Sequence, residues 1–258
     1  MRIPVVSCEL LVFDFDGVIV DGMQEYWWSA RRAALSLRPG TALPDAIPDG
    51  FRALRPWIHH GWEMVLIAAL LSEPSQALGA GDLQGVIRDY GAFCSEGLSR
   101  FGWTPTLLQE RLEHVRREAV ASDRARWLAM HRPYPGVPER LASLGDDGVA
   151  WAVLTTKGKD FTSELLASMG LTPARLDGRE SGPKPEVLLS LQRDWQLKGF
   201  IEDRKATLET VRGTAGLEAL PCWLASWGYL KPDDPATLPD GVRLLSPECF
   251  ARPLASWN

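Results

Sequence analysis

The chain has 258 residues, a hydrophobic fraction of 45%, a charged fraction of 24% and a formal net charge of −5 at pH 7. This composition is typical of a soluble globular protein with one large domain, or with a core domain that carries an inserted lobe. The negative charge provides no overall attraction to nucleic acid or anionic lipid, so we expect neither as a partner. Self-association into a homo-oligomer stays open.

Cysteine usage and hydropathy indicate a cytoplasmic protein. The four cysteines lie far apart and form no CxxC pair, which favours a reducing compartment over disulfides or a zinc site. The apolar stretch after Val5 is interrupted by Glu9, Asp14 and Asp16, so no signal peptide is expected. No segment reaches the ~18 apolar residues that a membrane span requires.

The first element along the chain is a strand that runs directly into acids. Residues 10–21 read LLVFDFDGVIVD, in which Asp14 and Asp16 follow an apolar run and Gly17 comes next. Burying an unpaired carboxylate costs roughly several kcal/mol of folding free energy. We therefore expect a cation at this position, and a divalent metal is the simplest candidate.

Residues 22–133 show helical periodicity and few strand signals. Helices are expected near 23–37, 56–71, 83–98 and 105–131, with breaks at 39–40, 44–48 and 72–81. The tryptophans of this region are interpreted as core residues, and the alternating arginines and glutamates of 110–118, Arg116 among them, as a solvated helix face. Such a helical block, inserted after the first strand, suggests a lid over the ligand-binding edge of a sheet.

Residues 134–258 alternate short apolar runs with helical patterns. Strands are expected at 149–155, 199–203, 222–225 and 242–245, and helices at 160–169, from Pro185 onward and around Leu208 and Val211. This alternation is typical of βαβ units. The predicted fold is therefore α/β, a Rossmann-like parallel sheet made from residues 1–21 and 134–258, with a helical cap domain of residues 22–133.

The acids suit phosphoryl transfer. Asp14 and Asp16 are two residues apart, so in extended backbone they point the same way. One carboxylate can act as a nucleophile while the other transfers protons, and Mg²⁺ can suppress their repulsion and bind a substrate phosphate. Downstream, Thr155 offers a hydroxyl donor at a strand end, Lys184 a fixed positive charge, and Asp203 a further metal ligand.

At this point the chain resembles the haloacid dehalogenase-like (HAD) superfamily of phosphotransferases. The motifs that match it, in the right order, are DFDGVIVD at 14–21, VLT at 153–155, KP at 184–185 and ED at 202–203. Segments outside these motifs, PYPGV at 133–137 and WGY at 227–229, are similar to the phosphoglycolate phosphatase-like branch. The resemblance covers nearly all of the core and does not extend through the helical region.

The resemblance implies a role for each matched position. Asp14 would be the nucleophile that becomes aspartyl-phosphate, and Asp16 the general acid and base, with its backbone carbonyl on Mg²⁺. Thr155 and Lys184 would hold the phosphoryl group, with Gly17 and Thr156 among the substrate-binding positions.

Asp203 would bind the metal directly or through water. Glu202 is expected to supply the acid that this motif otherwise carries four or five residues later. Which of Glu202 and Asp203 contacts the metal directly stays open.

The predicted function is a Mg²⁺-dependent phosphatase that hydrolyses a small phosphorylated metabolite. Two alternatives remain at this stage: a phosphomutase on the same scaffold, and a non-catalytic binding or regulatory protein that kept the fold. A dehalogenase is disfavoured because it needs neither a metal nor the second acid, Asp16.

Overall fold

The computed structural model describes residues 8–72 and 83–257. The chain divides into two compact units: a core unit of residues 1–21 and 132–258, and a helical unit of residues 22–131. The predicted break near residues 72–81 falls largely on residues 73–82, which lie outside the described ranges.

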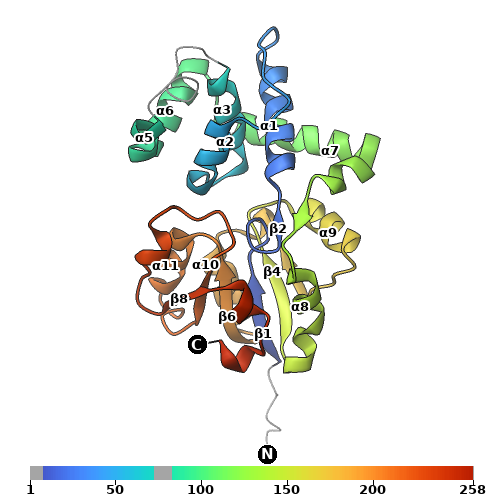
Figure 1. Ribbon diagram of the computed structural model, residues 1–258, viewed down its shortest axis with the longest axis vertical. Helices are drawn as coiled ribbons and strands as arrows, with labels where there is room; N and C mark the ends of the chain where they lie inside the picture. Colours follow the sequence, from blue (N-terminus) through green and yellow to red (C-terminus); the bar gives the residue numbers. More distant parts are fainter. Residues whose placement is uncertain (1–7, 73–82, 258) are drawn as a thin grey trace, which may run out of the picture. The chain divides into compact units, whose positions relative to one another are not determined.

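A parallel sheet of six strands organises the core unit (Figure 1). The strand order is β5-β4-β1-β6-β7-β8, which confirms the predicted Rossmann-like α/β fold. β5 was not expected from the sequence, since it is only three residues long. The strands are β1 (Glu9–Phe13), β4 (Ala150–Leu154), β5 (Arg175–Asp177), β6 (Gln196–Glu202), β7 (Cys222–Ala225) and β8 (Val242–Leu245).

Both faces of the central strands are buried, because successive side chains point to opposite sides. On one face Leu10, Val12 and Phe200 pack with apolar residues of α10 and α11. On the other face the ring of Phe13 contacts the rings of Trp151 and Phe250. The core helices are α8 (Val137–Ser143), α9 (Lys159–Ser168), α10 (Lys184–Leu191), α11 (Lys205–Arg212) and α12 (Pro247–Phe250), with short 3₁₀ turns at Leu144–Asp147, Arg179–Ser181, Asp234–Ala236 and Leu254–Ser256.

The two chain segments that lead into and out of the helical unit pair with each other. β2 (Val20–Asp21) and β3 (Arg132–Pro133) form a two-stranded antiparallel sheet, in which Asp21 lies opposite Arg132. This pairing places residues 132 and 133 with the core unit, two residues earlier than the boundary expected from the sequence.

Helices α1, α3 and α7 pack on one another in the helical unit. Trp27 and Trp127 are buried, as expected for core tryptophans. The other tryptophans of this unit are partly exposed, so the expectation is wrong for them: Trp28, Trp57, Trp62 and Trp103. The helices of this unit are α1 (Met23–Leu37), α2 (Asp49–Leu54), the 3₁₀ helix η1 (Arg55–Trp57), α3 (Gly61–Leu71), α5 (Leu83–Arg88), α6 (Tyr90–Phe101) and α7 (Pro105–Ala129).

The helix expected over 56–71 is interrupted before α3, and the interruption is a helix cap. Glu63 accepts hydrogen bonds from the backbone N–H groups of His59 (2.9 Å) and His60 (3.1 Å), and His60 is the N-cap residue. Such a capping box satisfies amide groups at the start of a helix that would otherwise lack partners. The helix expected over 83–98 is likewise divided at Asp89, which caps α6.

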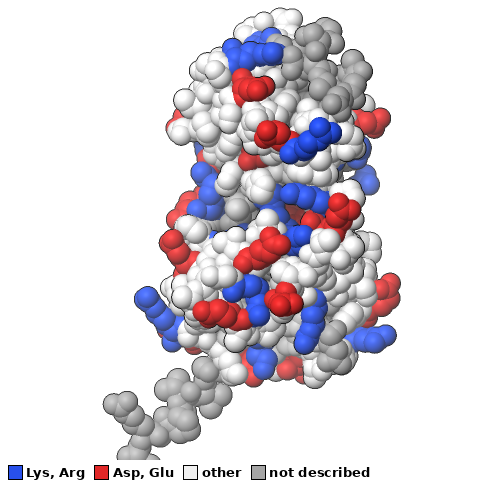
Figure 2. Space-filling model, turned by 90° about the vertical axis from the view of Figure 1, so that its left-hand side faces the viewer, with Lys and Arg blue, Asp and Glu red and all other residues white. Residues whose placement is uncertain are grey.

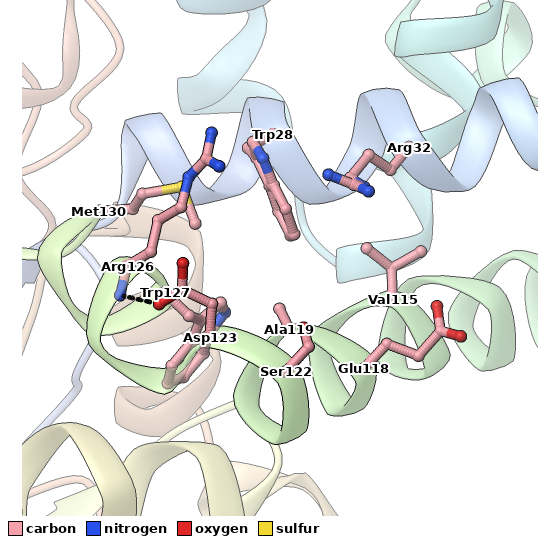
Figure 3. Close-up of a pocket in the computed structure, with 10 residues that line it drawn as sticks. All are labelled: Trp28, Arg32, Val115, Glu118, Ala119, Ser122, Asp123, Arg126, Trp127 and Met130. Carbon is pink, nitrogen blue, oxygen red and sulfur yellow. Dashed lines mark hydrogen bonds between the residues drawn. The ribbon is translucent and has the colours of Figure 1, made fainter.

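α7 is bent rather than continuous. Asp123 has non-helical backbone angles (φ −153°, ψ 69°), and its side chain accepts a hydrogen bond from the backbone N–H of Arg126 (3.1 Å), as an N-cap does. A pocket of about 230 Å³ lies beside this bend, lined by residues of α1 and α7 and by Met130 (Figure 3).

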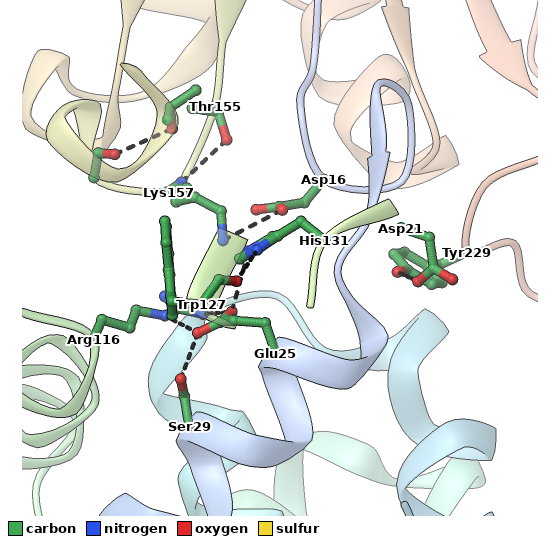
Figure 4. A network of polar contacts seen from close by, with 12 residues as sticks. Asp16, Asp21, Glu25, Ser29, Arg116, Trp127, His131, Thr155, Lys157 and Tyr229 are labelled. Carbon is green, nitrogen blue, oxygen red and sulfur yellow. Dashed lines mark hydrogen bonds and ion pairs between the residues drawn. The ribbon is translucent and has the colours of Figure 1, made fainter. Parts of the chain in front are cut away.

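One residue of the predicted solvated face of α7 is buried instead. Arg116 is 4% exposed and donates two hydrogen bonds, both of 2.7 Å, to the carboxylate of Glu25, which is completely buried (Figure 4). Ser29 donates a third bond to Glu25. The alternation of charges along the sequence did not show which arginine would find a buried acid on another helix.

On the face shown in Figure 2, acidic and basic side chains are interspersed, in keeping with the modest net charge. No helix within residues 8–72 and 83–257 is both long and apolar enough to cross a membrane.

Candidate active site

The sheet brings the predicted site residues to one edge. Asp14 follows β1, Thr155 follows β4 and Asp203 follows β6, and β1 lies between the other two strands. Because all three strands are parallel, their carboxyl ends share an edge, where open α/β sheets bind ligands.

Three carboxylates and one ammonium group form the centre of this edge. Asp14, Glu202 and Asp203 are buried, and each offers an oxygen within 4.8 Å of the others. Lys184, the first residue of α10, donates hydrogen bonds of 2.6 Å to Asp14 Oδ1 and to Glu202 Oε2. The expected convergence of residues 14, 184 and 203, which are far apart in sequence, is therefore present.

Burial and mutual repulsion hold protons on two of these acids. Loss of water contact, together with the charge of Glu202, raises the pKa of Asp14 to about 7 despite the opposing effect of Lys184. Burial also raises the pKa of Glu202 to about 7, with Asp203 adding to the effect. Although burial opposes it, the charges of Asp14 and Glu202 raise the pKa of Lys184, which stays protonated.

This donor set fits a magnesium ion. Three buried carboxylates lie beside the ammonium group of Lys184, and burial, with added repulsion between the acids, raises the pKa values of Asp14 and Glu202. Carboxylate oxygens are the ligands that Mg²⁺ prefers, and a divalent cation among them lowers the pKa of each acid. The carboxylate of Asp16 does not belong to this cluster of acids. A contact between Asp16 and the metal would therefore come from its backbone carbonyl, as the family resemblance implies.

Asp16 is paired with a lysine that we did not single out from the sequence (Figure 4). Nζ of Lys157 lies 3.4 Å from Asp16 Oδ1, and only 2% of the lysine side chain is exposed. Thr155 Oγ1 accepts the backbone N–H of Lys157 (3.1 Å), which leaves the threonine O–H proton for another acceptor. The position of Lys157, two residues beyond a strand-ending threonine, was the available signal.

Gly17 is required by the close approach of Asp203. Its φ of +95° favours glycine, and a Cβ atom at this position would collide with the Asp203 carboxylate. Asp203 also accepts the backbone N–H of Tyr229 (2.9 Å), whose hydroxyl donates to Asp21. The segment around Tyr229 thus fixes the metal-ligand candidate Asp203 against the loop that follows Asp14.

Thr156, which was expected among the substrate-binding positions, is exposed at the surface of the core unit.

No family model matches the chain. Two curated relatives are similar to it in sequence. N-acetylmuramic acid 6-phosphate phosphatase of Pseudomonas aeruginosa is 26% identical over 133 residues, which are 48% of this chain and 57% of that protein, so the match spans little more than half of the relative. Phosphoglycolate phosphatase of Pseudomonas fluorescens is 23% identical over 262 residues, covering 93% of this chain and 79% of the relative.

Solved structures share the fold across nearly the whole chain. A predicted phosphoglycolate phosphatase from Haemophilus somnus has a TM-score of 0.59 at 16% identity, covering 93% of this chain and 95% of that one. A HAD-superfamily hydrolase of subfamily IA from Geobacter sulfurreducens has a TM-score of 0.51 at 18% identity, covering 92% and 91%. These likenesses show that the chain has the haloacid dehalogenase-like fold, and in sequence it is distantly similar to two phosphatases, one of them a phosphoglycolate phosphatase.

Proposed function

We propose that this protein is a Mg²⁺-dependent phosphatase that hydrolyses a small phosphorylated metabolite through an aspartyl-phosphate on Asp14. The observation that carries the proposal is the buried cluster in which Lys184 bridges Asp14 and Glu202, beside Asp203, at the carboxyl edge of the sheet. A nucleophile, a fixed positive charge and a set of oxygen donors at one point are what phosphoryl transfer requires.

In the first step the Asp14 carboxylate attacks phosphorus in line with the leaving oxygen. The bond from phosphorus to that oxygen breaks, and Asp16 gives the leaving alcohol its proton. Lys184 holds Asp14 in place and offsets negative charge on the phosphoryl group, and the Thr155 hydroxyl donates to a phosphoryl oxygen.

In the second step Asp16, now a carboxylate, takes a proton from water. The water oxygen attacks phosphorus, the bond to Asp14 breaks, and inorganic phosphate is released. The ammonium group of Lys157 holds the Asp16 carboxylate in position after the first step, until the second step begins. Mg²⁺, held by Asp14, Asp203 and Glu202 with the backbone carbonyl of Asp16, would supply positive charge that neutralises the acids and the substrate phosphate.

The class of substrate is inferred from the relatives. Both relatives are named as phosphatases of a phosphorylated carboxylic acid, phosphoglycolate in one case and N-acetylmuramic acid 6-phosphate in the other. We therefore expect this chain to act on a phosphorylated organic acid, and these two compounds should head the panel of substrates to be tested.

The test is phosphate release by the full chain with Mg²⁺ and, separately, with EDTA. Asp14→Asn should abolish turnover, because an amide cannot form the phosphoenzyme, whereas the matched variant Asp146→Asn, at an exposed position, should retain it. Mg²⁺-dependent hydrolysis that survives Asp14→Asn would exclude the assigned nucleophile. Conversion of a sugar phosphate to its isomer without release of phosphate would identify a phosphomutase, and no turnover of any compound would favour the non-catalytic alternative.

A further inference from the structure

The helical unit contains a pocket to which the proposed hydrolysis assigns no role. It lies beside the bend of α7, and α1 contributes Trp28 and Arg32 to its lining while α7 contributes Arg126 (Figure 3). Its volume of about 230 Å³ is below the ~300–1,000 Å³ typical of sites for drug-sized ligands. The pocket is therefore matched to a single ring or a short chain.

Two guanidinium groups in this pocket have no acidic partner. The guanidinium carbon of Arg32 lies 4.6 Å from the ring centroid of Trp28, a stacked arrangement that leaves its N–H edge able to donate. Across residues 8–72 and 83–257, no carboxylate lies within 4.0 Å of the guanidinium of Arg32 or of Arg126. The two side chains lie on opposite sides of Trp28 (Figure 3), and an anionic group bound beside either one would accept charge-assisted hydrogen bonds from it.

The acids of the pocket are already engaged but keep acceptor capacity. Glu118 lies 3.4 Å from His114, and Asp123 accepts the backbone N–H of Arg126. Each ionised carboxylate has about four acceptor positions, so both can accept further donors. Hydroxyl groups on a ligand could donate hydrogen bonds to these two carboxylates, whereas an anion without hydroxyl groups could not.

We propose that this pocket binds a small hydroxylated organic anion, such as a sugar acid or a sugar phosphate. The anionic group would contact one of the two arginines, Arg32 or Arg126, the carbon skeleton would pack on Trp28 between them, and hydroxyls would donate to Glu118 and Asp123. This proposal does not depend on the hydrolysis proposed for the core unit, since all of the residues that carry it belong to the helical unit.

Binding of glucuronate and of glucose 6-phosphate to the full chain tests the proposal, by calorimetry and saturation-transfer NMR in EDTA so that no Mg²⁺-dependent turnover occurs. Glucose and inorganic phosphate serve as reference compounds that lack the charge or the carbon skeleton. At least one charged sugar should bind with a Kd below about 10 mM, at least tenfold more tightly than both references. The two probes distinguish a carboxylate from a phosphate as the preferred anion.

The double variant Arg32→Gln/Arg126→Gln should weaken this binding at least tenfold. The variant Arg111→Gln/Arg117→Gln removes the same charge from α7 outside the pocket and should leave binding unchanged. Both pocket arginines are exposed, so their replacement is compatible with folding, which circular dichroism verifies. Any one of four results would overturn the proposal. Glucose, or inorganic phosphate alone, binds as tightly as the charged sugars; the pocket variant binds them as tightly as the wild type; or neither charged sugar binds.

Discussion

Replacing Lys184 by methionine tests the electrostatic account of the active-site edge. Lys184 donates to both Asp14 and Glu202, whose pKa values are about 7. Methionine keeps much of the volume and removes the charge. We expect the variant to be less stable than the wild type, and the loss of stability to grow with pH.

The magnitude follows from the protons that the folded state must hold. A carboxyl whose pKa is raised on folding binds more protons in the folded state, so stability falls as pH rises from the unfolded pKa to the folded pKa. Without Lys184 the pKa values of Asp14 and Glu202 rise above 7, and this window extends upward. At pH 8, one unit beyond the present pKa, the added cost is about 1 kcal/mol for each carboxyl, or roughly 2–3 kcal/mol in total. At pH 6 both carboxyls are largely protonated in either protein, and lost hydrogen bonds leave a difference of ~1–2 kcal/mol.

The assay is urea unfolding of the full chain in EDTA at pH 6 and at pH 8. Lys198→Met is the matched control, because Lys198 pairs with Glu9 at 3.1 Å where about a third of each side chain is exposed, and such pairs contribute ~0–1 kcal/mol. The double variant Lys184→Met/Glu202→Gln should regain part of the stability at pH 8, since it removes one of the two buried charges. An equal loss at both pH values, or no loss at all, would refute the reasoning.

Three further outcomes are expected. Gly17→Ala should lower thermal stability more than Gly40→Ala does, because both glycines have positive φ but only a Cβ at residue 17 meets another residue; equal melting temperatures would contradict this. Arg116→Met should cost ~3–5 kcal/mol in urea unfolding by removing the guanidinium from the buried Glu25 carboxylate, whereas Arg117→Met, at a partly exposed pair, should cost less than ~1 kcal/mol. Calorimetric Mg²⁺ affinity should rise between pH 6 and pH 8, because the two carboxyls of pKa about 7 must lose their protons to bind a cation; a pH-independent affinity would disprove their part in the site.

Three of the site residues, Asp14, Thr155 and Asp203, could be placed from the sequence because each follows an apolar run. A buried strand that ends in Asp14, Thr155 or Asp203 has little freedom in where it places that residue, once the strands are parallel and neighbouring. The order of the motifs then identified the edge at which they meet. The six-stranded sheet differs from the expected one mainly by β5, whose three residues carry too little pattern to be recognised.

What the sequence did not predict depends on contacts between distant segments. Lys157 and Arg116 look like ordinary surface cations in the chain, and only the folded arrangement pairs each with an acid far away in sequence. The interruption before α3 arises from the Glu63 side chain bonding back to two amide groups, a local event that the apolar periodicity of 56–71 conceals. Periodicity reports which face is buried, and it does not report which polar partner is found there.

Two buried charge clusters in the chain differ in how well their charges balance. In the helical unit, one carboxylate, Glu25, meets the fork of one guanidinium, Arg116, with both N–H···O bonds at 2.7 Å. At the sheet edge Lys184 donates to two carboxylates, Asp14 and Glu202, with the Asp203 carboxylate beside them, and the first two acids keep protons up to about pH 7. The guanidinium of Arg116 offsets the charge of Glu25 where α1 packs against α7, and His131 Nε2 lies 3.7 Å from the same carboxylate. Where Lys184 bonds to two carboxylates and a third lies beside them, a bound cation would offset the remaining negative charge. The excess of acids, together with their burial, therefore supports the proposed metal site.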